Sequence, residues 1–404
     1  MKKLVLFGAG KIGRSFIGQL FSRGGYEIVF VDVDRALITE MNHRRSYRVI
    51  IKSEAGDEVL NIANIRGIHI SEREKIVDEI AGASLLATCV GPLNLPSIVP
   101  FISEAVRRKR SRGLDCRTDL IIAENLRNAA IMLCGMFIKE LEDASFVDQN
   151  IGLVETSIGK MVPIMTRRDM EEDRLQVFAE PYNILILDEK AFRNEVPDIP
   201  GLAPKKNMKA WVDRKSFIHN LGHAAGAYYS YIRNPRLVYF YQAMDDPDCR
   251  EFTRKTMLQS AEALIREYPE EFIMSDLTGH IDDLLKRFRN QALGDTVFRV
   301  GMDLYRKLGP DDRLVGAIRI ASKHGLPFDK IAFSLACGFH FRGTDEAGRM
   351  FPADESFAGE LNTSGPAALI KSHCGIDPSG EKNIFAAIMN ALDVLKNPLN
   401  KNRP

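Results

Sequence analysis

The feature that most constrains the fold is a glycine-rich segment, Gly8-Ala9-Gly10-Lys11-Ile12-Gly13, near the start of the chain. The apolar run before it, Leu4–Phe7, is short enough for a buried strand, and a helical pattern follows it to about Arg23. A second apolar run, Ile28–Val31, ends at Asp32. A strand, a glycine turn, a helix and a second strand in this order predict the first part of a dinucleotide-binding parallel sheet.

Each glycine of this segment has its own predicted role. Gly8 allows a tight turn, Gly10 lets the backbone approach a pyrophosphate, and Gly13 permits close packing of helix on strand. The helix N-terminus would present its unpaired N–H groups to the phosphates. The predicted cofactor-binding residues of this loop are Gly8, Ala9, Gly10, Lys11, Ile12 and Gly13.

Asp32 is the predicted ribose-binding acid, and it decides the choice of cofactor. It follows Gly13 by 19 residues, close to the spacing of about 20 in dinucleotide-binding folds. A carboxylate there accepts hydrogen bonds from the ribose hydroxyls and repels a 2′-phosphate, so the sequence predicts NAD rather than NADP. Val90 and Gly91 are also expected to contact the cofactor, because they lie at the end of a later strand predicted over Ser84–Val90.

Periodicity divides the rest of the chain into two parts. In the N-terminal half, apolar runs alternate with helical patterns and predict an α/β fold, a doubly wound Rossmann-type domain over 1–203. Three prolines and a glycine between Val196 and Lys206 should interrupt any regular element, so we place the boundary at 203/204. Beyond it the sequence predicts a mainly α-helical substrate and catalytic domain over 204–404. The helices are expected around 208–232, 250–268, 279–291, 311–324, 327–338 and 381–396.

Composition argues against several classes of partner. Lys and Arg number 55 against 54 Asp and Glu, so charge gives no reason to expect nucleic acid or an anionic membrane. Six scattered cysteines without a C-x-x-C pair predict no zinc or other metal site. No apolar stretch approaches the roughly 20 residues that span a bilayer. Because the first residues already read as a strand, we expect no signal peptide and a cytoplasmic protein.

The segment Arg214–Gly226 carries the candidate catalytic residues. At about 100° per residue, Lys215, His219, Asn220 and His223 fall within an arc of about 140° on a helix, opposite an apolar face. Two glycines share that side, Gly222 and Gly226. Glycines inside a helix cost roughly 1 kcal/mol each relative to alanine, so we expect something to approach this backbone closely. An ordinary solvated face would also contain acids, and this segment has none.

These residue types suit the oxidation of a secondary alcohol. A base must take the hydroxyl proton as hydride leaves the carbon, and a partly desolvated lysine near other cations has a suitably lowered pKa. Lys215 is the candidate. Carboxamide donors stabilise the developing oxyanion without adding charge. Asn220 is one such donor, and Asn125, at the end of a strand predicted over Leu120–Ala123, is the other.

Three motifs together resemble a known family. They are the run Gly8–Gly18, the pair Glu124-Asn125 and the Lys215-x4-Asn220-x2-His223 spacing. On these motifs the chain is similar to the polyol-specific long-chain dehydrogenases, and most similar to their mannitol-1-phosphate 5-dehydrogenase subgroup. Further matches near the C-terminus extend the resemblance over nearly the whole chain: Asp312-Arg313-Leu314, Gly325-Leu326-Pro327 and His340-Phe341-Arg342.

The resemblance implies zinc-independent catalysis with Lys215 as general acid/base. It also implies Asn125 and Asn220 as the oxyanion-stabilising pair and His223 as a residue that binds or orients substrate. The implied reaction converts D-mannitol 1-phosphate and NAD into fructose 6-phosphate and NADH. The implied protein is a monomer whose small polyol or sugar-phosphate substrate lies in a cleft between two domains.

A substrate phosphate would need nearby cations, and arginine is favoured because it makes bidentate contacts. The candidates are Arg299, Arg306, Lys307, Arg313 and Arg342. The chain departs from the family pattern at Gly159-Lys160-Met161-Val162-Pro163 and at Glu155-Thr156-Ser157. We expect both stretches to line the substrate cleft, so the identity of the polyol stays open.

Three other functions remain as alternatives. One is a dehydrogenase or reductase for an unphosphorylated hexitol or a hexuronate. Another is a hydroxyacid dehydrogenase of the 6-phosphogluconate type, whose lysine and asparagine are usually separated by three residues, whereas four separate Lys215 and Asn220. The third is a non-catalytic NAD-sensing protein, which would have no reason to retain the lysine, both asparagines and the histidine together.

Overall fold

The computed structural model describes residues 2–396, which divide into two compact units between Val212 and Asp213. The sequence-based boundary at 203/204 falls within strand β11 (Leu202–Lys205), and residues 397–404 of the predicted second domain lie outside the described range. Within residues 2–396, no helix combines the length and the apolar character needed to cross a membrane.

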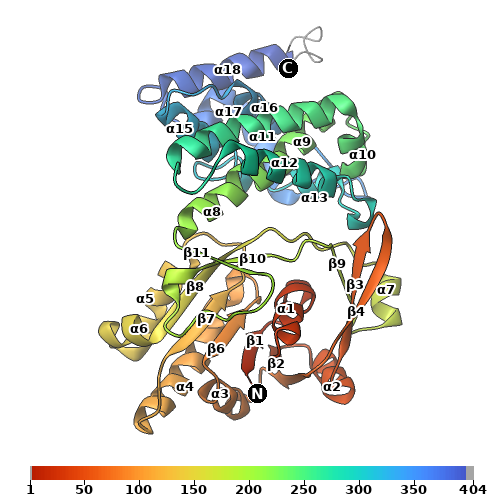
Figure 1. Ribbon diagram of the computed structural model, residues 1–404. Helices are drawn as coiled ribbons and strands as arrows, with labels where there is room; N and C mark the ends of the chain where they lie inside the picture. Colours follow the sequence, from red (N-terminus) through yellow and green to blue (C-terminus); the bar gives the residue numbers. More distant parts are fainter. Residues whose placement is uncertain (1, 397–404) are drawn as a thin grey trace. The chain divides into compact units, whose positions relative to one another are not determined.

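An eight-stranded sheet forms the centre of the first unit (Figure 1). Its strand order is β11-β10-β8-β7-β6-β1-β2-β5, and β10 and β8 are its one antiparallel pair. The strands, besides β11, are β1 (Lys3–Phe7), β2 (Glu27–Asp32), β5 (Ile65–His69), β6 (Leu85–Thr88), β7 (Thr118–Ile122), β8 (Ile151–Ile158) and β10 (Leu185–Asp188). The chain winds outward from β1 in both directions, which confirms the predicted doubly wound Rossmann-type fold. The crevice between β1 and β6 is therefore where such a sheet binds its ligand.

Separate apolar cores cover the two faces of this sheet. In β1, Leu4 and Leu6 face one core and Val5 and Phe7 face the other, as the two-residue period of a strand dictates. Helices α1 (Gln19–Arg23) and α2 (Arg35–Arg44) cover the first face. The second face is covered by α3 (Arg73–Ala81), α4 (Val99–Ser111), α5 (Ala129–Leu141) and α6 (Ala144–Asn150).

A smaller three-stranded sheet in the first unit was not predicted from the sequence. Its order is β4-β3-β9, formed by β3 (Tyr47–Ser53), β4 (Gly56–Ile62) and β9 (Val177–Ala179), with α7 (Arg167–Glu172) between β8 and β9 in the chain. β3 and β4 are an antiparallel hairpin whose last pair joins Ser53 to Gly56. The hairpin signal is present in the sequence as alternating residues on either side of a two-residue turn.

Strand β11 corrects the expectation that the proline-rich segment contains no regular element. Pro204 lies inside it and pairs in register with Leu187 of β10. β11 is the edge strand of the sheet, so only one of its sides bonds to a neighbour. A proline, which lacks an N–H, is tolerated at such an edge.

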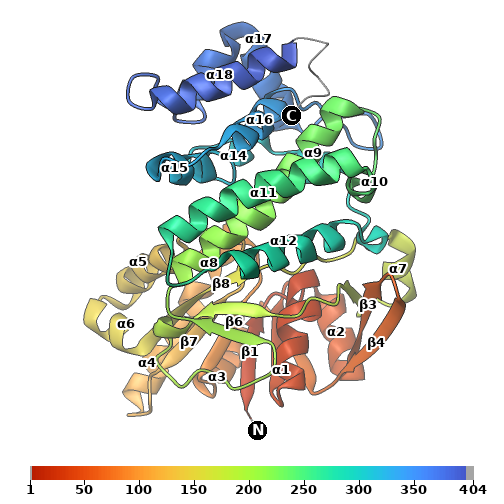
Figure 2. The same cartoon turned by 45° about the horizontal axis from the view of Figure 1, so that its top comes forward.

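The second unit is helical, as the sequence predicts (Figure 1). α8 (Met208–Arg214) leads into it, and the following helices are α9 (Leu221–Arg233), α10 (Phe240–Asp245), α11 (Pro247–Glu267), α12 (Met274–Phe288), α13 (Val297–Gly301), α14 (Leu304–Lys307), α15 (Val315–Lys323), α16 (Asp329–Phe339), α17 (Pro352–Ser372) and α18 (Lys382–Lys396). Figure 2 shows α11 running beside α9 and α12, against which it packs. The predicted helices are found with shifted ends, whereas α10, α13, α14 and α17 were not predicted.

Candidate cofactor and catalytic sites

The glycine loop follows β1, at the crevice between β1 and β6, and two of its glycines are required by the fold itself. Gly8 has φ +94°, which favours glycine, and a Cβ there would lie 2.7 Å from the carbonyl oxygen of Cys89. A Cβ on Gly13 would lie 2.1 Å from the carbonyl oxygen of Gly8. Gly10 differs, because a Cβ there would meet no atom within 4 Å. The chain itself therefore gives no reason for a glycine at Gly10, but a ligand that approaches the backbone would.

Asp32 ends β2 beside this loop. Its Oδ2 accepts a hydrogen bond from the backbone N–H of Ala9 at 2.6 Å, and its Oδ1 accepts one from Asp34 at 2.9 Å. Each carboxylate oxygen can accept a second bond, so the acid can hold the loop and still bind ribose hydroxyls. Of the other predicted loop residues, Lys11 and Ile12 form the start of the helix that follows.

The helix after the glycine loop begins as a π-helix over Gly13–Gly18 and contains a residue that the sequence analysis missed. Arg14 is buried, and its Nε donates to Ala9 O at 2.7 Å while its Nη1 donates to Leu175 O at 2.6 Å. The carbonyl of Arg14 in turn accepts a bond from the Tyr47 hydroxyl at 2.7 Å. Arg14 therefore fixes the loop to the rest of the first unit. Arg14 lies in the run Gly8–Gly18, but its bond to Leu175, 161 residues away, could not be read from the sequence.

Val90 and Gly91 follow β6 on the other side of the crevice, where Glu124 holds them. The Glu124 carboxylate accepts the Gly91 N–H at 3.1 Å and the Thr88 hydroxyl at 3.4 Å. Burial raises the pKa of Glu124 to about 6, although the backbone bonds from Gly91 and Val90 act in the opposite direction. Glu124 was recognised only as part of a motif, and the structure assigns it to the support of the cofactor-side loop.

Asn125 follows Glu124, beyond the carboxyl end of β7. It therefore lies at the same edge of the sheet as the glycine loop. The parallel strands β1, β6 and β7 all end at this edge. Because ligands of doubly wound sheets bind outside the carboxyl ends of the strands, the fold gives Asn125 a suitable place for an oxyanion donor.

In the second unit, the predicted catalytic segment is not a plain α-helix. Lys215–Asn220 forms a π-helix between α8 and α9. In an α-helix, Lys215 and Asn220 would point about 140° apart, since each residue advances by about 100°. The i→i+5 bonds of a π-helix make five residues complete roughly one turn, so Lys215 and Asn220 come to the same side. π-Turns are rare and frequently occur at functional sites.

The two helix glycines are closely approached, as expected, but by side chains of the protein itself. Gly222 and Gly226 are both buried. A Cβ on Gly222 would lie 2.6 Å from the sulfur of Met257 on α11, and one on Gly226 would lie 2.9 Å from Met244 on α10. The close approach is therefore that of neighbouring helices, and these glycines serve packing rather than ligand binding.

The two histidines of this segment are less exposed than the side chains of an ordinary solvated face. His219 is only 5% exposed, and the half-buried ring of His223 stacks on Phe288 with the centroids 4.0 Å apart. Burial, together with the charges around them, lowers the pKa of both histidines well below the usual value. Both rings are therefore neutral at neutral pH, and His223 can donate or accept a hydrogen bond but does not carry charge.

A cluster of cations surrounds His223, and it includes three of the predicted phosphate ligands. After burial, the charges that lower the pKa of His223 most are those of Arg313, Lys307, Arg287 and Arg299. Arg313 is 6% exposed, and its Nη1 lies 3.4 Å from the carbonyl oxygen of Asn220. Lys307 is 5% exposed and donates to Val300 O at 2.6 Å. Arg287 was not predicted.

Arg313 pairs with Asp312 at 2.7 Å and Arg299 pairs with Asp295, and the other two predicted phosphate ligands also have partners within the chain. Arg306 pairs with Asp303 at 2.6 Å and with Asp312 at 3.7 Å. The Nη1 of Arg342 donates to the carbonyl oxygens of Phe339 and Phe341. Neither residue is among the charges that lower the pKa of His223 most.

The two stretches expected to line the substrate cleft take part in packing of the first unit. Lys160 is 6% exposed, and its ammonium donates to Glu180 O, Tyr182 O and the Asn183 side chain, which accounts for its three N–H groups. Glu155 accepts a bond from the first turn of α5 at Ala130 N. These residues therefore hold neighbouring segments in place, and the expectation that they line a cleft finds no support in their contacts.

Comparison with known proteins covers both units. Residues 2–201 match the family model described as the mannitol dehydrogenase Rossmann domain, and residues 207–388 match the mannitol dehydrogenase C-terminal domain. Among solved structures, a D-sorbitol dehydrogenase in substrate-free form is similar, with a TM-score of 0.81 and 16% identity over 99% of this chain and 94% of that chain. A Pseudomonas fluorescens mannitol 2-dehydrogenase, in a ternary complex with NAD and D-mannitol, gives a TM-score of 0.72 and 16% identity over 99% and 92%. At this identity the likeness concerns the fold.

Proposed function

Because the chain belongs to the mannitol dehydrogenase family, a family of NAD-dependent polyol dehydrogenases, we propose that it interconverts D-mannitol 1-phosphate and fructose 6-phosphate. The cofactor loop, with an acid at Asp32 and an open approach at Gly10, supports NAD as the partner in hydride transfer. When bound, NAD accepts the hydride. The remaining steps fall to side chains of this chain.

In the proposed mechanism Lys215 is the general acid/base. As the C–H bond of the alcohol carbon breaks and its electron pair leaves as hydride, the hydroxyl proton passes to the neutral amine nitrogen of Lys215, which becomes an ammonium, and a C=O bond forms. In the reverse direction the same nitrogen returns the proton to the carbonyl oxygen.

Carboxamides and the neutral histidine orient the reacting oxygen in this proposal. The π-helix brings Asn220 to the side of Lys215. The Asn220 amide can then donate a hydrogen bond to the oxygen whose proton Lys215 takes. We assign Asn125 as the second amide donor. His223, neutral because its pKa is lowered, would hydrogen-bond a substrate hydroxyl without repelling the neighbouring cations.

The observation that carries phosphate specificity is the cation cluster around His223. Arg299, Lys307 and Arg313 all lower the pKa of that histidine. Lys307 and Arg313 are buried. Arg313 is paired with Asp312 at 2.7 Å and Arg299 with Asp295, whereas the buried ammonium of Lys307 has no ion pair among residues 2–396. In the proposal, a substrate anion supplies the opposite charge that Lys307 lacks. A neutral hexitol supplies no such charge, a hexuronate supplies one, and a phosphate ester supplies close to two.

The test is oxidation of NADH by the purified enzyme at neutral pH with fructose 6-phosphate, fructose, tagaturonate and fructuronate. The proposal predicts rapid turnover of fructose 6-phosphate and weak turnover of the other three. Preference for fructose or a uronate would overturn the phosphate assignment and favour the alternative of an unphosphorylated hexitol or hexuronate. Absence of turnover with every ketose, despite NADH binding, would favour the NAD-sensing alternative.

A further inference from the structure

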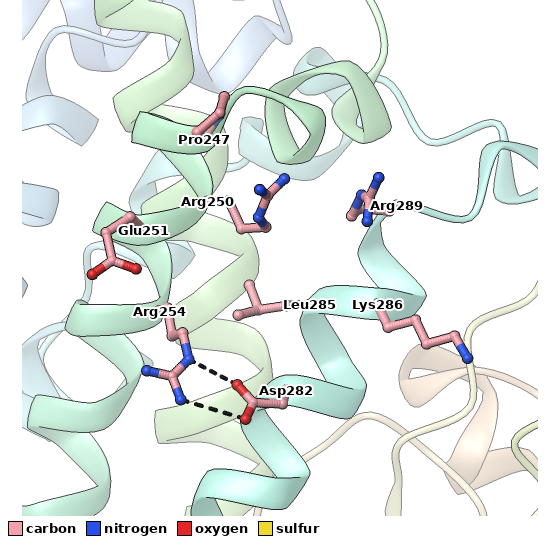
Figure 3. A pocket seen from close by; sticks show the side chains of 8 residues that line it. All are labelled: Pro247, Arg250, Glu251, Arg254, Asp282, Leu285, Lys286 and Arg289. Atoms are coloured by element: carbon pink, nitrogen blue, oxygen red, sulfur yellow. Dashed lines mark hydrogen bonds and ion pairs between the residues drawn. The ribbon is translucent and has the colours of Figure 1, made fainter.

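A cavity of about 450 Å³ lies between α11 and α12, on residues that the proposed reaction does not use (Figure 3). Each helix contributes residues spaced as one face of a helix. Those of α11 are Pro247, Arg250, Glu251 and Arg254, and those of α12 are Asp282, Leu285 and Lys286, followed by Arg289 directly after the helix. Facing stripes of packed helices are normally apolar, but here Leu285 is the one large apolar residue of the lining.

The charges of this pocket do not cancel within it. Arg254 pairs with Asp282 at 2.8 Å, and Figure 3 shows the two side chains facing each other. The other acid of the lining, Glu251, pairs with Lys255 outside the pocket at 3.3 Å. Asp245, also outside the lining, neutralises Arg289 at 2.9 Å. Two cations, Arg250 and Lys286, have no ion pair among residues 2–396, so the pocket carries an excess of about two positive charges.

Two of the guanidinium groups are already held in place with donors to spare. Among residues 2–396, Arg250 and Arg289 each form hydrogen bonds through a single nitrogen. In Arg250 it is Nη1, which donates to the carbonyl oxygens of Met244 (2.8 Å) and Asp245 (3.3 Å) at the end of α10. In Arg289 it is Nε, which donates to the Asp245 carboxylate. A guanidinium has five N–H donors, so both groups keep donors for another ligand. Fixing them in advance lowers the entropy lost when such a ligand binds.

From these charges and donors we infer that the α11–α12 pocket binds a small phosphate-class oxyanion, either inorganic phosphate or a phosphate monoester. The excess of two charges matches a phosphate better than a carboxylate, which carries one. Arginine forks suit tetrahedral oxyanions through bidentate bonds. The volume is within the range of small-molecule sites, about 300–1,000 Å³. This site is independent of the proposed catalytic function.

The pocket lies beside residues that contact the ring of His223. Arg289 directly follows Phe288, whose ring stacks on His223, and Arg250 bonds the end of α10, whose Phe240 contacts the same histidine ring at 5.5 Å. An anion that joins Arg250 to Arg289 therefore joins the ends of α10 and α12. We expect it to raise the melting temperature of the protein.

The experiment is calorimetric titration of the full-length protein with inorganic phosphate, at constant ionic strength, with acetate as the comparison anion. Arg289→Gln and Lys286→Gln remove charge from exposed side chains, and Arg266→Gln is the matched control, because Arg266 is an exposed cation on α11 outside the lining. We expect phosphate to bind more tightly than acetate, and each pocket variant to weaken phosphate binding about tenfold, the loss of one charge-assisted hydrogen bond. The control should bind as the wild type does.

Phosphate could also enter the proposed substrate site, so the variants decide between the two locations. If Arg289→Gln and Lys286→Gln bind phosphate as tightly as the wild type, while Arg313→Gln loses it, the pocket is not an anion site. Equal affinity for acetate and phosphate would also overturn the inference. A phosphate-induced rise in melting temperature that disappears in Arg289→Gln, but persists in Arg313→Gln, would support it. These readouts do not depend on catalytic activity.

Discussion

The backbone N–H of Ala9 donates to the carboxylate of Asp32 at 2.6 Å, so the acid that would bind ribose also holds the glycine loop. In the proposed cofactor site, the same carboxylate therefore serves both the fold and the ribose. This double role allows the charge of Asp32 to be separated experimentally from its hydrogen bond to the loop.

Asp32→Asn keeps an oxygen for Ala9 N–H but removes the negative charge, whereas Asp32→Ala removes both. We expect both variants to raise the ratio of NADPH to NADH efficiency about tenfold or more, since the repulsion of a 2′-phosphate is lost. NADH affinity should fall further in Asp32→Ala, because its loop loses an anchor. The measurement is kcat/KM with each cofactor, and an unchanged ratio in both variants would refute the ribose assignment.

Gly10 and Gly13 should respond differently to alanine. A Cβ on Gly13 would lie 2.1 Å from Gly8 O, so Gly13→Ala is expected to unfold or strongly destabilise the first unit. A Cβ on Gly10 meets nothing within 4 Å, so Gly10→Ala should keep the wild-type melting temperature. If the pyrophosphate approaches Gly10, this variant should still bind NADH about tenfold more weakly. Wild-type NADH affinity in a folded Gly10→Ala protein would contradict the predicted approach.

A third comparison concerns helix packing around the catalytic segment. Gly222→Ala places a methyl group 2.6 Å from the sulfur of Met257, which should destabilise the protein by about 1–3 kcal/mol despite the better helix propensity of alanine. Gly279→Ala on α12 is the matched control, because its Cβ would meet no atom within 4 Å. The control should be stabilised by about 0.5–1 kcal/mol. Chemical denaturation measures both, and equal effects would refute the packing role of Gly222.

Lys307 provides a pH test of phosphate binding. Burial, and then the charges of Arg313 and Arg306, lower its pKa to about 7. The side chain of the free enzyme is therefore charged below about pH 7 and neutral above it, so its attraction for phosphate weakens as the pH rises. We expect kcat/KM for fructose 6-phosphate to fall across this pKa, by about tenfold in total.

Lys307→Gln gives the control for this pH dependence. The variant should have a lower kcat/KM at pH 6.5, about that of the wild type at high pH, and should lack the limb near pH 7. Identical pH profiles for the variant and the wild type would show that Lys307 does not contribute to substrate binding.

Local sequence signals were enough to predict the centre of the first unit. The run Leu4–Phe7, the glycine loop and Asp32 are close together in the chain, and each has a role that its neighbours already specify. Pro204 shows the limit of such signals. A proline breaks a central strand but is tolerated at an edge, and the sequence does not state which strand will be the edge.

The geometry of the candidate catalytic segment was not predicted from the sequence. A helical wheel assumes about 100° per residue, and the π-turn at Lys215–Asn220 departs from that period. The residue that approaches Gly222, Met257, could not be identified from the sequence because it is distant along the chain. The same holds for Arg14 and for the α11–α12 pocket, whose partners are brought together only by the fold.

The most direct test of the account is the turnover of Lys215→Ala with fructose 6-phosphate, measured beside its dissociation constant for NADH. Lys215 is assigned the proton transfer and not cofactor binding, so turnover should fall by about two to four orders of magnitude while NADH affinity stays near the wild-type value. Wild-type turnover in this variant would contradict the central claim that Lys215 is the general acid/base. No other residue of this segment is assigned the proton transfer, so unchanged turnover would leave the proposed mechanism without its base.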